Sequence, residues 1–364
     1  MKKQSIKLLT LGAIAASALY LGSCNNDDDN PQPAVSFAEL EGQVLSSFNT
    51  TVGTPLYNDF KTKAEALNQA VITLAATPTA ANQVAAQNAW KAVRIVWEQS
   101  EGFLIGPVDD NNYDPYMDTW PTDRNELDAL LASTQPLDAA ALGGFTNEET
   151  QLTLRGFHPL EYLLWKDNVS YTAREKEYMQ GLAQDVLNNV NKLVTDWAPY
   201  STELVNAGKP GSRYTSKKDA LLTLSGAFVG ICGEVGEGKM LEPFEGPNAG
   251  QPDSTITESP YSHNSIADFK NNIQGAYNVY LCKYGGSTGK SLSDLVAYNN
   301  KTLDQNIKTK FEAAIASFDG ITTTFEQAIY TQRTAVQNTL DAIGSLKTTV
   351  DGPLNDYINQ YVKD

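Results

Sequence analysis

The chain has 364 residues, with 43 acidic side chains against 27 basic ones and a net charge of −16. That balance argues against a protein that binds nucleic acid through its phosphates, because such binding needs clustered Lys and Arg side chains. The 340 residues after position 24 are enough for two domains of ordinary size, each with its own hydrophobic core.

Residues 1–24 have the pattern of a bacterial lipoprotein signal peptide. Three lysines within the first seven residues precede an apolar run over 8–21, which at about 14 residues is shorter than a membrane-spanning helix needs. The run ends in Leu21-Gly22-Ser23-Cys24, which resembles a lipobox. We therefore expect Cys24 to become the lipidated first residue of the mature chain and to anchor it to a membrane. An ordinary signal peptide ending near a chance cysteine is the alternative.

Residues 25–35 are expected to form a disordered acidic tether, because the stretch NNDDDNPQP is polar and acidic and contains prolines. An acidic run directly after a lipidated cysteine also resembles the surface-export signal of Bacteroidetes lipoproteins; a plain solvated linker is the alternative. We expect the protein in the cell envelope, anchored to the outer membrane on its periplasmic or its outer face. No second long apolar stretch is expected, and the mature chain carries a net charge of −19, which suits either solubility or attraction of cations.

Helical periodicity dominates residues 36–205, where apolar residues recur at intervals of three and four. The expected helix ends are Thr77-Pro78, Gly106-Pro107 and Pro199. Residues 108–121 mix aromatic and acidic residues with two prolines and are expected to form a structured loop. Helices are predicted over residues 37–48, 56–76, 80–105 and 123–133, within 156–165, and over 174–199.

Residues 206–364 are expected to form a second helical bundle, since the polar, turn-rich stretch over 201–213 is the best boundary between two halves. A helix is predicted over 216–240, followed by a loop over 243–264 that contains four prolines and is long enough to indicate a functional loop. The next helix begins at Ser265 and Asp268, which have capping-box spacing, and three more helical stretches follow. Period-two alternation is scarce, so the fold class is all-α.

The two halves resemble each other, which suggests an internal duplication. Each contains a long helix with a Glu-rich end and then an irregular loop, as in WEQSEGFLIGP at 97–107 and GEVGEGKMLEP at 233–243. We expect two up-and-down helical bundles packed side by side, with a site in the cleft between them.

Cys232 and Cys282 remain once Cys24 is set aside. Both lie in apolar helical contexts, so we expect two buried free thiols, although export to an oxidising compartment would permit a disulfide. The chain has no C-x-x-C pair, which argues against a zinc finger or a cysteine nucleophile.

One of the two histidines lies in the stretch GFHPLEYLLW at 156–165. His158 and Glu161 are three residues apart and share a helix face, so together they can bind a metal ion or form a catalytic acid–base pair. Alternatively, Pro159 begins a helix that His158 caps and that Glu161 supports at its third position. One such pair supplies only two ligands, and a metal site normally needs at least three. The His-Glu-x-x-His motif of zinc peptidases is absent.

Further acidic residues could complete a site. Glu98 and Glu101 have the same three-residue spacing, and Glu234 and Glu237 repeat it in the second half. A solvated helix face is the alternative for both pairs, but their apolar, Gly-rich surroundings are unusual for carboxylates. The other candidates also have structural alternatives, as a turn residue for His263 and as loop-packing residues for Asp118 and Trp120.

Several short motifs in matching order resemble the imelysin family. They are G-x-H-x-x-E at 156–161, W-E-x-x-E-x-F-x-x-G-P at 97–107, W-P-x-D at 120–123, G-E-x-x-x-x-x-M at 233–240, and S-x-N-S-x-x-D followed by N-V-Y within 262–280. The resemblance covers nearly all of the mature chain.

This resemblance implies an all-helical protein of two bundle-like halves, with the motif residues in a pocket between them. Members of the family are periplasmic or surface proteins of bacteria, described as insulin-cleaving metallopeptidases or as iron-regulated proteins, and the domain occurs in periplasmic parts of iron-uptake systems. The resemblance favours His158 and Glu161 as functional residues and carries Glu101 and Glu234 along with them. The family often has Glu-Arg-Met where this chain has Gly238-Lys239-Met240, so no role is carried over to 238–239.

Three functions are compatible with these residues. We favour a metal-binding lipoprotein that serves iron or other cation uptake with iron-transport partner proteins, and that binds iron, or alternatively zinc, through His158, Glu161, Glu101 and Glu234. The second is a metallopeptidase whose ion activates water, with His158 and Glu161 as the catalytic residues. The third is a non-catalytic module that binds a small ligand or a protein. Further pocket candidates are Glu98, Trp120, Ser262 and His263.

Overall fold

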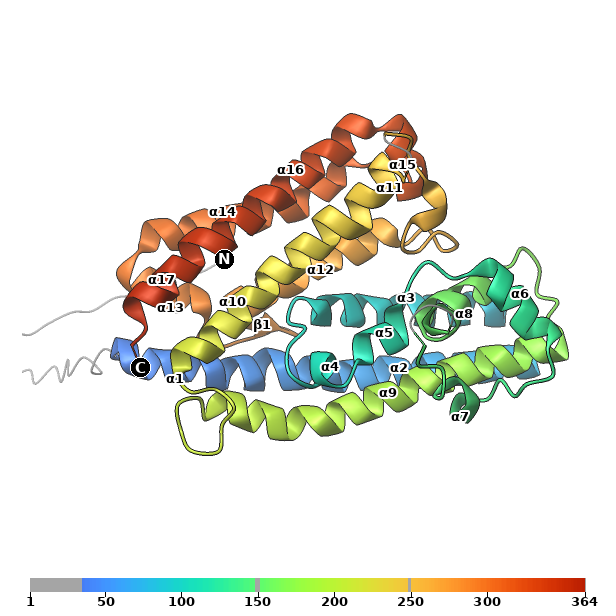
Figure 1. The fold of residues 1–364 in the computed structure, drawn as a ribbon, viewed down its shortest axis with the longest axis horizontal. Coiled ribbons are helices and arrows are strands. Elements are labelled where there is room, and N and C mark those ends of the chain that lie inside the picture. The colour runs from blue at the N-terminus through green and yellow to red at the C-terminus, as the bar shows by residue number, and fades with distance from the viewer. Residues whose placement is uncertain (1–34, 148–150, 248–249, 364) are drawn as a thin grey trace, which may run out of the picture. The chain divides into compact units, whose positions relative to one another are not determined.

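Almost every element of the structure is a helix, as the periodicity predicted (Figure 1). The computed structural model describes residues 35–147, 151–247 and 250–363. Within these ranges the strands are β1 (Lys283–Tyr284) and β2 (Ser287–Thr288), which pair antiparallel in a short hairpin. The all-α fold class is therefore confirmed. The predicted signal peptide with Cys24 and the predicted tether, apart from Val35, lie outside the described residues.

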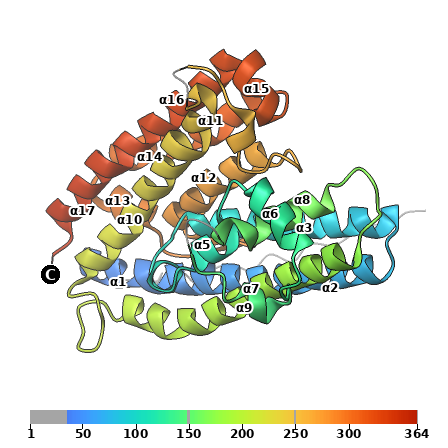
Figure 2. The same ribbon diagram turned by 45° about the vertical axis from the view of Figure 1, so that its right-hand side comes forward.

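The first half is built from three long helices and several short ones. Helices α2, α3 and α9 are the long ones, and α2 packs against both α3 and α9 (Figures 1 and 2). The elements are α1 (Phe37–Ser47), η1 (Phe48–Gly53), α2 (Thr54–Ala76), α3 (Ala80–Glu101), α4 (Pro107–Asp110), α5 (Tyr113–Asp118), α6 (Arg124–Ala132), α7 (Ala139–Leu142), η2 (Leu152–Leu154), α8 (Phe157–Leu164) and α9 (Ala173–Val205).

The second half forms a second group of long helices, in which α10 and α14 each contact both α12 and α16. Its elements, drawn in yellow to red in Figure 1, are α10 (Lys217–Gly233), η3 (Glu234–Met240), α11 (Leu241–Glu245), η4 (Ser254–Ile256), α12 (Ser265–Leu281), the β1–β2 hairpin, α13 (Leu292–Asn299), α14 (Lys301–Ser317), η5 (Phe318–Gly320), α15 (Phe325–Thr331), α16 (Arg333–Thr349), η6 (Val350–Leu354) and α17 (Asn355–Tyr361).

The two halves share one core. Buried apolar side chains form a connected cluster that runs from Leu40 in α1 to Val362 after α17, and Ser36–Asp364 belong to one compact unit. The predicted boundary between residues 205 and 206 coincides with the end of α9. The division into two bundles stays a prediction.

Helix α9 continues past Pro199 to Val205, so the predicted end at this proline is wrong. A proline inside a helix removes one backbone hydrogen bond. Trp197, Tyr200 and Leu204 lie on either side of it and are all buried in the core. The burial of these large apolar side chains outweighs the missing bond.

The predicted capping box at Ser265 and Asp268 is also wrong. Asn264 is the N-cap of α12, without a side-chain cap bond, and Ser265 is the first helical residue. The Asp268 carboxylate accepts hydrogen bonds from Ser259 Oγ at 2.6 Å and from Asn264 Nδ2 at 2.7 Å. Asp268 is therefore bound to side chains of the preceding loop instead of closing a box on its own helix.

Cys232 in α10 and Cys282 after α12 are both buried and free, as expected. The run Lys217–Glu245 comprises α10, η3 and α11. It is long and apolar enough by composition to cross a membrane, because it contains an 18-residue window with a mean hydropathy of 1.3. The expectation of no second long apolar stretch is therefore wrong. Half of that apolar window is buried inside the protein, where α10 packs against α12 and α16.

The contact between α3 and α12 joins the two halves at a pair of glycines. A Cβ atom on Gly102, at the end of α3, would lie 2.2 Å from the backbone nitrogen of Ala276. A Cβ atom on Gly275 would lie 2.1 Å from the carbonyl oxygen of Gln99. Only a hydrogen atom fits at either position, so the two helix backbones approach closely here.

Gly275→Ala should destabilise the protein by about 1–3 kcal/mol or more, because the added methyl group meets rigid backbone and forces α3 and α12 apart. The matched control is Gly344→Ala in α16, where an added Cβ meets nothing within 4 Å. There the same change should stabilise the helix by up to about 1 kcal/mol. Urea unfolding followed by circular dichroism measures both; equal midpoints for the two variants would contradict the close approach.

Candidate functional site

A cluster of charged side chains is buried where α3 meets α5, α8, η3 and α12. Among the described residues it contains six carboxylates and three basic side chains, each at most 5% exposed: Glu98, Glu101, Asp118, Glu161, Glu258 and Asp268, with Arg94, His158 and Lys239. We call this set the charged cluster. Buried charges are costly unless they are paired, so an excess of carboxylates over basic groups calls for a further source of positive charge or for protons.

Arg94 lies at the centre of the charged cluster. Its guanidinium contacts the carboxylates of Glu98 and Asp118, and its Nη2 donates to Glu258 Oε1 at 2.7 Å. Its Nε lies 3.6 Å from Asp268 Oδ1. Two of these carboxylates belong to the first half of the chain and two to the second, so one buried guanidinium links both halves.

Aromatic rings complete the surroundings of Arg94. Its guanidinium carbon lies 5.6 Å from the ring centre of Trp90 and 5.2 Å from that of Phe157. A cation near aromatic faces gains about 0.5–2 kcal/mol, most when it is desolvated. The side chain is thus held on its apolar sides as well as by its ion pairs.

Helix α3 aligns three members of the charged cluster, because Arg94, Glu98 and Glu101 follow one another at intervals of four and three residues. Asn272 of α12 bridges the two glutamates, since its Nδ2 donates to Glu98 Oε2 at 2.6 Å and to Glu101 Oε2 at 2.7 Å. Burial raises the pKa of both glutamates well above the usual value, and repulsion by Glu98 adds to this for Glu101. Burial therefore disfavours the ionised form of both glutamates, and their contacts with Arg94 and Lys239 oppose that effect.

Asp118, at the end of α5, is a member of the charged cluster and not simply a loop-packing residue. Its Oδ2 accepts a hydrogen bond from Trp97 Nε1 at 2.7 Å, and its Oδ1 contacts Arg94 and lies 3.0 Å from His158 Nε2. Burial opposes ionisation, but Arg94 and His158 hold the pKa of Asp118 well below its usual range. It is therefore a carboxylate at neutral pH.

The backbone conformation explains why the G-x-H-x-x-E motif begins with a glycine. Gly156 has a φ of +84°, and a Cβ there would lie 2.1 Å from the carbonyl oxygen of Met117. This close approach places the start of α8 beside Asp118. The helix begins at Phe157 with Gly156 as its N-cap, so the prediction that His158 caps the helix is wrong: the left-handed turn at Gly156 already starts the helix one residue earlier.

The histidine and glutamate of the motif connect α5, α8 and the loop before α12. His158 Nδ1 lies 3.5 Å from Glu161 Oε2, and Glu161 Oε1 accepts the backbone N–H of Ser262 at 2.7 Å. Burial alone would lower the pKa of His158, but the neighbouring carboxylates of Asp118 and Glu161 raise it to about 9. The imidazole is therefore protonated at neutral pH and pairs with two carboxylates.

Lys239 brings a second buried cation from η3. Its Nζ donates to Glu101 Oε2 at 2.9 Å and to Glu258 Oε1 at 3.2 Å, and lies 3.2 Å from Glu234 Oε1. The ammonium also lies 5.4 Å from the ring centre of Trp120. The π-helical turn of η3 carries both Glu234 and Lys239, and such wide turns are frequent at functional sites.

The remaining candidates lie at or beyond the edge of the charged cluster. Ser262 contributes its backbone N–H to Glu161, while its buried Oγ has no hydrogen-bond partner. His263 is 55% exposed and pairs with Glu326 at 2.9 Å. Glu237 is exposed and pairs with Lys347. The spacing that linked Glu234 to Glu237 therefore did not bring both residues to one site.

Three groups of charged-cluster residues place one donor atom of each member within 4.8 Å of the others, as a metal site requires. They are Asp118–His158–Glu258, Glu98–Glu101–Asp118 and Glu98–Glu258–Asp268. The first contains a histidine and lies beside a pocket of about 240 Å³ that His158 and Glu258 help to line. We call this the His158 pocket. Two members of the first group line this pocket, whereas each of the other two groups has one member in the lining of a pocket.

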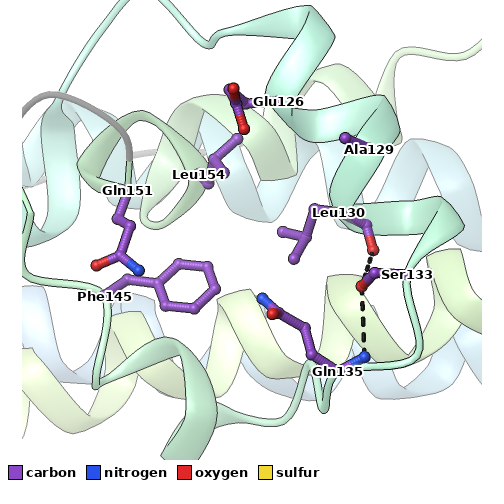
Figure 3. Close-up of a pocket in the computed structure, with 8 residues that line it drawn as sticks. All are labelled: Glu126, Ala129, Leu130, Ser133, Gln135, Phe145, Gln151 and Leu154. Atoms are coloured by element: carbon purple, nitrogen blue, oxygen red, sulfur yellow. Dashed lines mark hydrogen bonds between the residues drawn. The ribbon is translucent and has the colours of Figure 1, made fainter.

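Another pocket lies away from this chemistry. It has a volume of about 280 Å³ and is lined by residues of α6 and of the segment before α8. Figure 3 shows Phe145 and Leu130 pointing toward each other across it. Glu126 is the only acidic or basic side chain among the residues that line it. No member of the charged cluster takes part, so we assign it no function.

Sequence reasoning did not propose Arg94, Glu258, Asp268, Lys239 or Asn272 as site residues. Arg94 had a usable signal, since it lies four residues before Glu98 on an otherwise apolar helix face. Asp268 lies within the S-x-N-S-x-x-D motif but was assigned to a helix cap. Glu258 lies in the loop over 243–264, and its place beside Arg94 depends on packing between residues 164 positions apart.

The imelysin family model matches residues 53–350. The chain is similar to iron-regulated protein A of Synechococcus elongatus, with 30% identity over 323 residues that make up 86% of each chain. It also resembles the crystal structure of a protein named as an iron-regulated protein A precursor, from Parabacteroides distasonis, with a TM-score of 0.80, 25% identity, and coverage of 90% of this chain and 97% of that one. An imelysin-like protein of Psychrobacter arcticum has the same fold, with a TM-score of 0.73 and 14% identity over 90% of this chain and 97% of that chain.

The raised pKa of His158 predicts a pH-dependent stability. A native pKa of about 9, against about 6.5 in the unfolded chain, means that the contribution of His158 is complete below about pH 6.5 and is lost as the pH rises through about 9. Between these values the free energy of unfolding should fall by about 1 kcal/mol per pH unit because of this residue.

Urea unfolding at a series of pH values tests this. His158→Gln should show a shallower fall than the wild type between pH 6.5 and 9, whereas His263→Gln, which changes the exposed histidine, should retain the wild-type slope. A His158→Gln slope equal to that of the wild type would contradict the prediction.

Proposed function

This chain belongs to the imelysin family, and we propose that it binds a metal ion, with iron as the favoured ion, at Asp118, His158 and Glu258. The main support for this proposal is that these three buried side chains, from α5, α8 and the loop before α12, lie close together. The names of its relatives support iron: two of them are called iron-regulated protein A. We further propose that the bound ion serves metal uptake at the cell envelope.

The donor atoms fit a divalent transition metal. One imidazole and two carboxylates suit iron, and zinc is the alternative. Glu258 Oε2 is buried without a hydrogen-bond partner, so it is free to bind a cation. The excess of carboxylates in the charged cluster supplies the negative charge that compensates a divalent ion.

Arg94 and His158 set the conditions for binding. Arg94 contacts Asp118 and Glu258 and holds their carboxylates in place, while it also competes with an ion for their charge. Only a neutral imidazole binds a metal, and His158 has a pKa of about 9. Binding must therefore release a proton from His158 near neutral pH.

The proposed role in uptake also rests on the N-terminal sequence. A lipid at Cys24 and an acidic tether over 25–35 would hold the protein at the outer membrane. At that position it could pass an ion to transport proteins of the envelope. Iron-transport proteins are therefore the proposed partners.

Metal binding has a direct test. Chelator-stripped protein titrated with Fe²⁺ without oxygen, and with Zn²⁺, should bind one ion saturably and release about one proton per ion, as measured by calorimetry in buffers of different ionisation enthalpy. His158→Ala and Glu258→Gln should each weaken binding by about tenfold or more, and His263→Ala should bind as the wild type does. Absence of saturable binding by the wild type would rule the proposal out.

Lipidation has a separate test. In cells grown with radiolabelled palmitate, the wild-type chain should carry the label and sediment with membranes, because the lipobox cysteine receives the acyl chains. Cys24→Ser should carry no label and stay out of the membrane fraction. If Cys24→Ser behaved as the wild type does, an ordinary signal peptide or another anchor would be indicated.

A further inference from the structure

A second pocket reaches the charged cluster from the α10 side. It has a volume of about 460 Å³ and is lined by residues from the end of α3, from α4, from the α9–α10 connection, and from α10 and η3. That volume is typical of pockets that hold small organic ligands and is far more than a bare ion fills. We call it the Glu101 pocket, after the charged-cluster residue in its lining. It shares none of its lining residues with the His158 pocket.

The lining of the Glu101 pocket is acidic. Four carboxylates, from Glu101, Asp109, Asp110 and Glu234, face one basic residue, Arg213. Arg213 is already engaged, since its Nη1 donates to Asp110 at 2.7 Å and its Nε donates to Glu203 at 2.9 Å. Lys239, which is not part of the lining, contacts both Glu101 and Glu234. Four lining carboxylates therefore face two cations, and this excess of acidic groups favours a positively charged ligand.

Glu101, one of the lining residues, has an acceptor atom without a donor. Its Oε2 accepts hydrogen bonds from Lys239 and Asn272, whereas its Oε1 is buried without a hydrogen-bond partner. The side chain is 1% exposed. A buried acceptor without a donor is costly, more so on a charged group. A donor brought by a ligand would relieve that cost.

Lys239 shows which kind of donor these carboxylates accept. Its ammonium group is bound by Glu101 at 2.9 Å, by Glu234 at 3.2 Å and by Glu258 at 3.2 Å. Glu101 and Glu234 line the Glu101 pocket, and Glu258 lines the His158 pocket. The side chain of Lys239 thus connects lining residues of both pockets.

The rest of the pocket lining includes apolar residues that suit a hydrocarbon chain. Leu104, Ile105 and Ile231 contribute apolar side chains, and Gly226 and Gly230 lie one helical turn apart on α10. A Cβ atom at either glycine would meet nothing within 4 Å. These two lining positions therefore leave room that a larger side chain would occupy.

We propose that the Glu101 pocket binds an organic cation: a primary ammonium or guanidinium group on a short aliphatic chain. The charged group donates to Glu101 Oε1 and Glu234, and the chain packs along Leu104 and Ile231. The cation belongs either to a free alkyl amine or to a Lys or Arg side chain of a partner. This site does not depend on a metal ion at Asp118, His158 and Glu258.

The test uses n-pentylamine, n-butylguanidine and the neutral analogue 1-pentanol, titrated into the full mature chain by calorimetry and by ligand-observed NMR. The two cations should bind saturably, and 1-pentanol should not. Gly230→Leu fills the pocket at a helical position with open space, and Gly344→Leu makes the same change on α16, where a Cβ also meets nothing within 4 Å. Gly230→Leu and Glu101→Gln should each weaken binding by about tenfold or more, and Gly344→Leu should leave it unchanged.

Gly230→Leu keeps the test decisive if Glu101→Gln fails to fold. Equal binding of 1-pentanol, equal binding by Gly230→Leu, or no saturable cation binding by the wild type would each overturn the proposal. A lysine-containing tripeptide and its Nζ-acetylated form separate the two sources. If the unmodified tripeptide binds as well as the free amines, and its acetylated form does not, the source is a partner side chain. If the free amines bind and the unmodified tripeptide does not, the source is a small molecule.

Discussion

The burial of Arg94 is the constraint on which the rest of this structure depends. A guanidinium without water needs counter-charges on several sides, and four carboxylates supply them. Glu98 and Asp118 come from the first half of the chain, and Glu258 and Asp268 come from the second. The pairing is complete only when α3, α5 and α12 meet, so folding of the two halves and assembly of the site are one event.

Close backbone contacts make this assembly rigid. Gly102 and Gly275 let α3 and α12 touch, and Gly156 lets α8 touch the end of α5. Each contact lies beside a residue of the charged cluster: Gly102 follows Glu101, and Gly156 precedes His158 by two positions. Small residues therefore fix the distances between charged groups that lie on different helices, which is what a site of defined geometry requires.

Electrostatics gives the charged cluster its character. Its six carboxylates outnumber its three basic side chains, and the pKa values and contacts of its members reflect that excess. Burial raises the pKa values of Glu98 and Glu101 well above the usual range. His158 has a pKa of about 9 and so carries a proton at neutral pH. Lys239 donates hydrogen bonds to two carboxylates. Protons and a lysine thus occupy places that other cations could take. The His158 pocket and the Glu101 pocket are two separate approaches to those places.

The sequence by itself determined the helices and the local pairs within them, because intervals of three and four residues place side chains on one helix face whatever the surroundings. The helical fold, the His158–Glu161 pair and the Glu98–Glu101 pair follow from that rule. Only the tertiary structure decided which pairs became a site. Glu98 and Glu101 lie in the charged cluster with Arg94, whereas Glu237 lies at the surface. Glu258, which is 164 residues after Arg94 in the chain, packs beside it. Local signals also failed where packing was stronger: the buried residues around Pro199 continued α9, and the turn at Gly156 moved the helix start. Spacing reports neighbours along a helix, whereas contacts between helices depend on how the buried surfaces of the whole chain fit together.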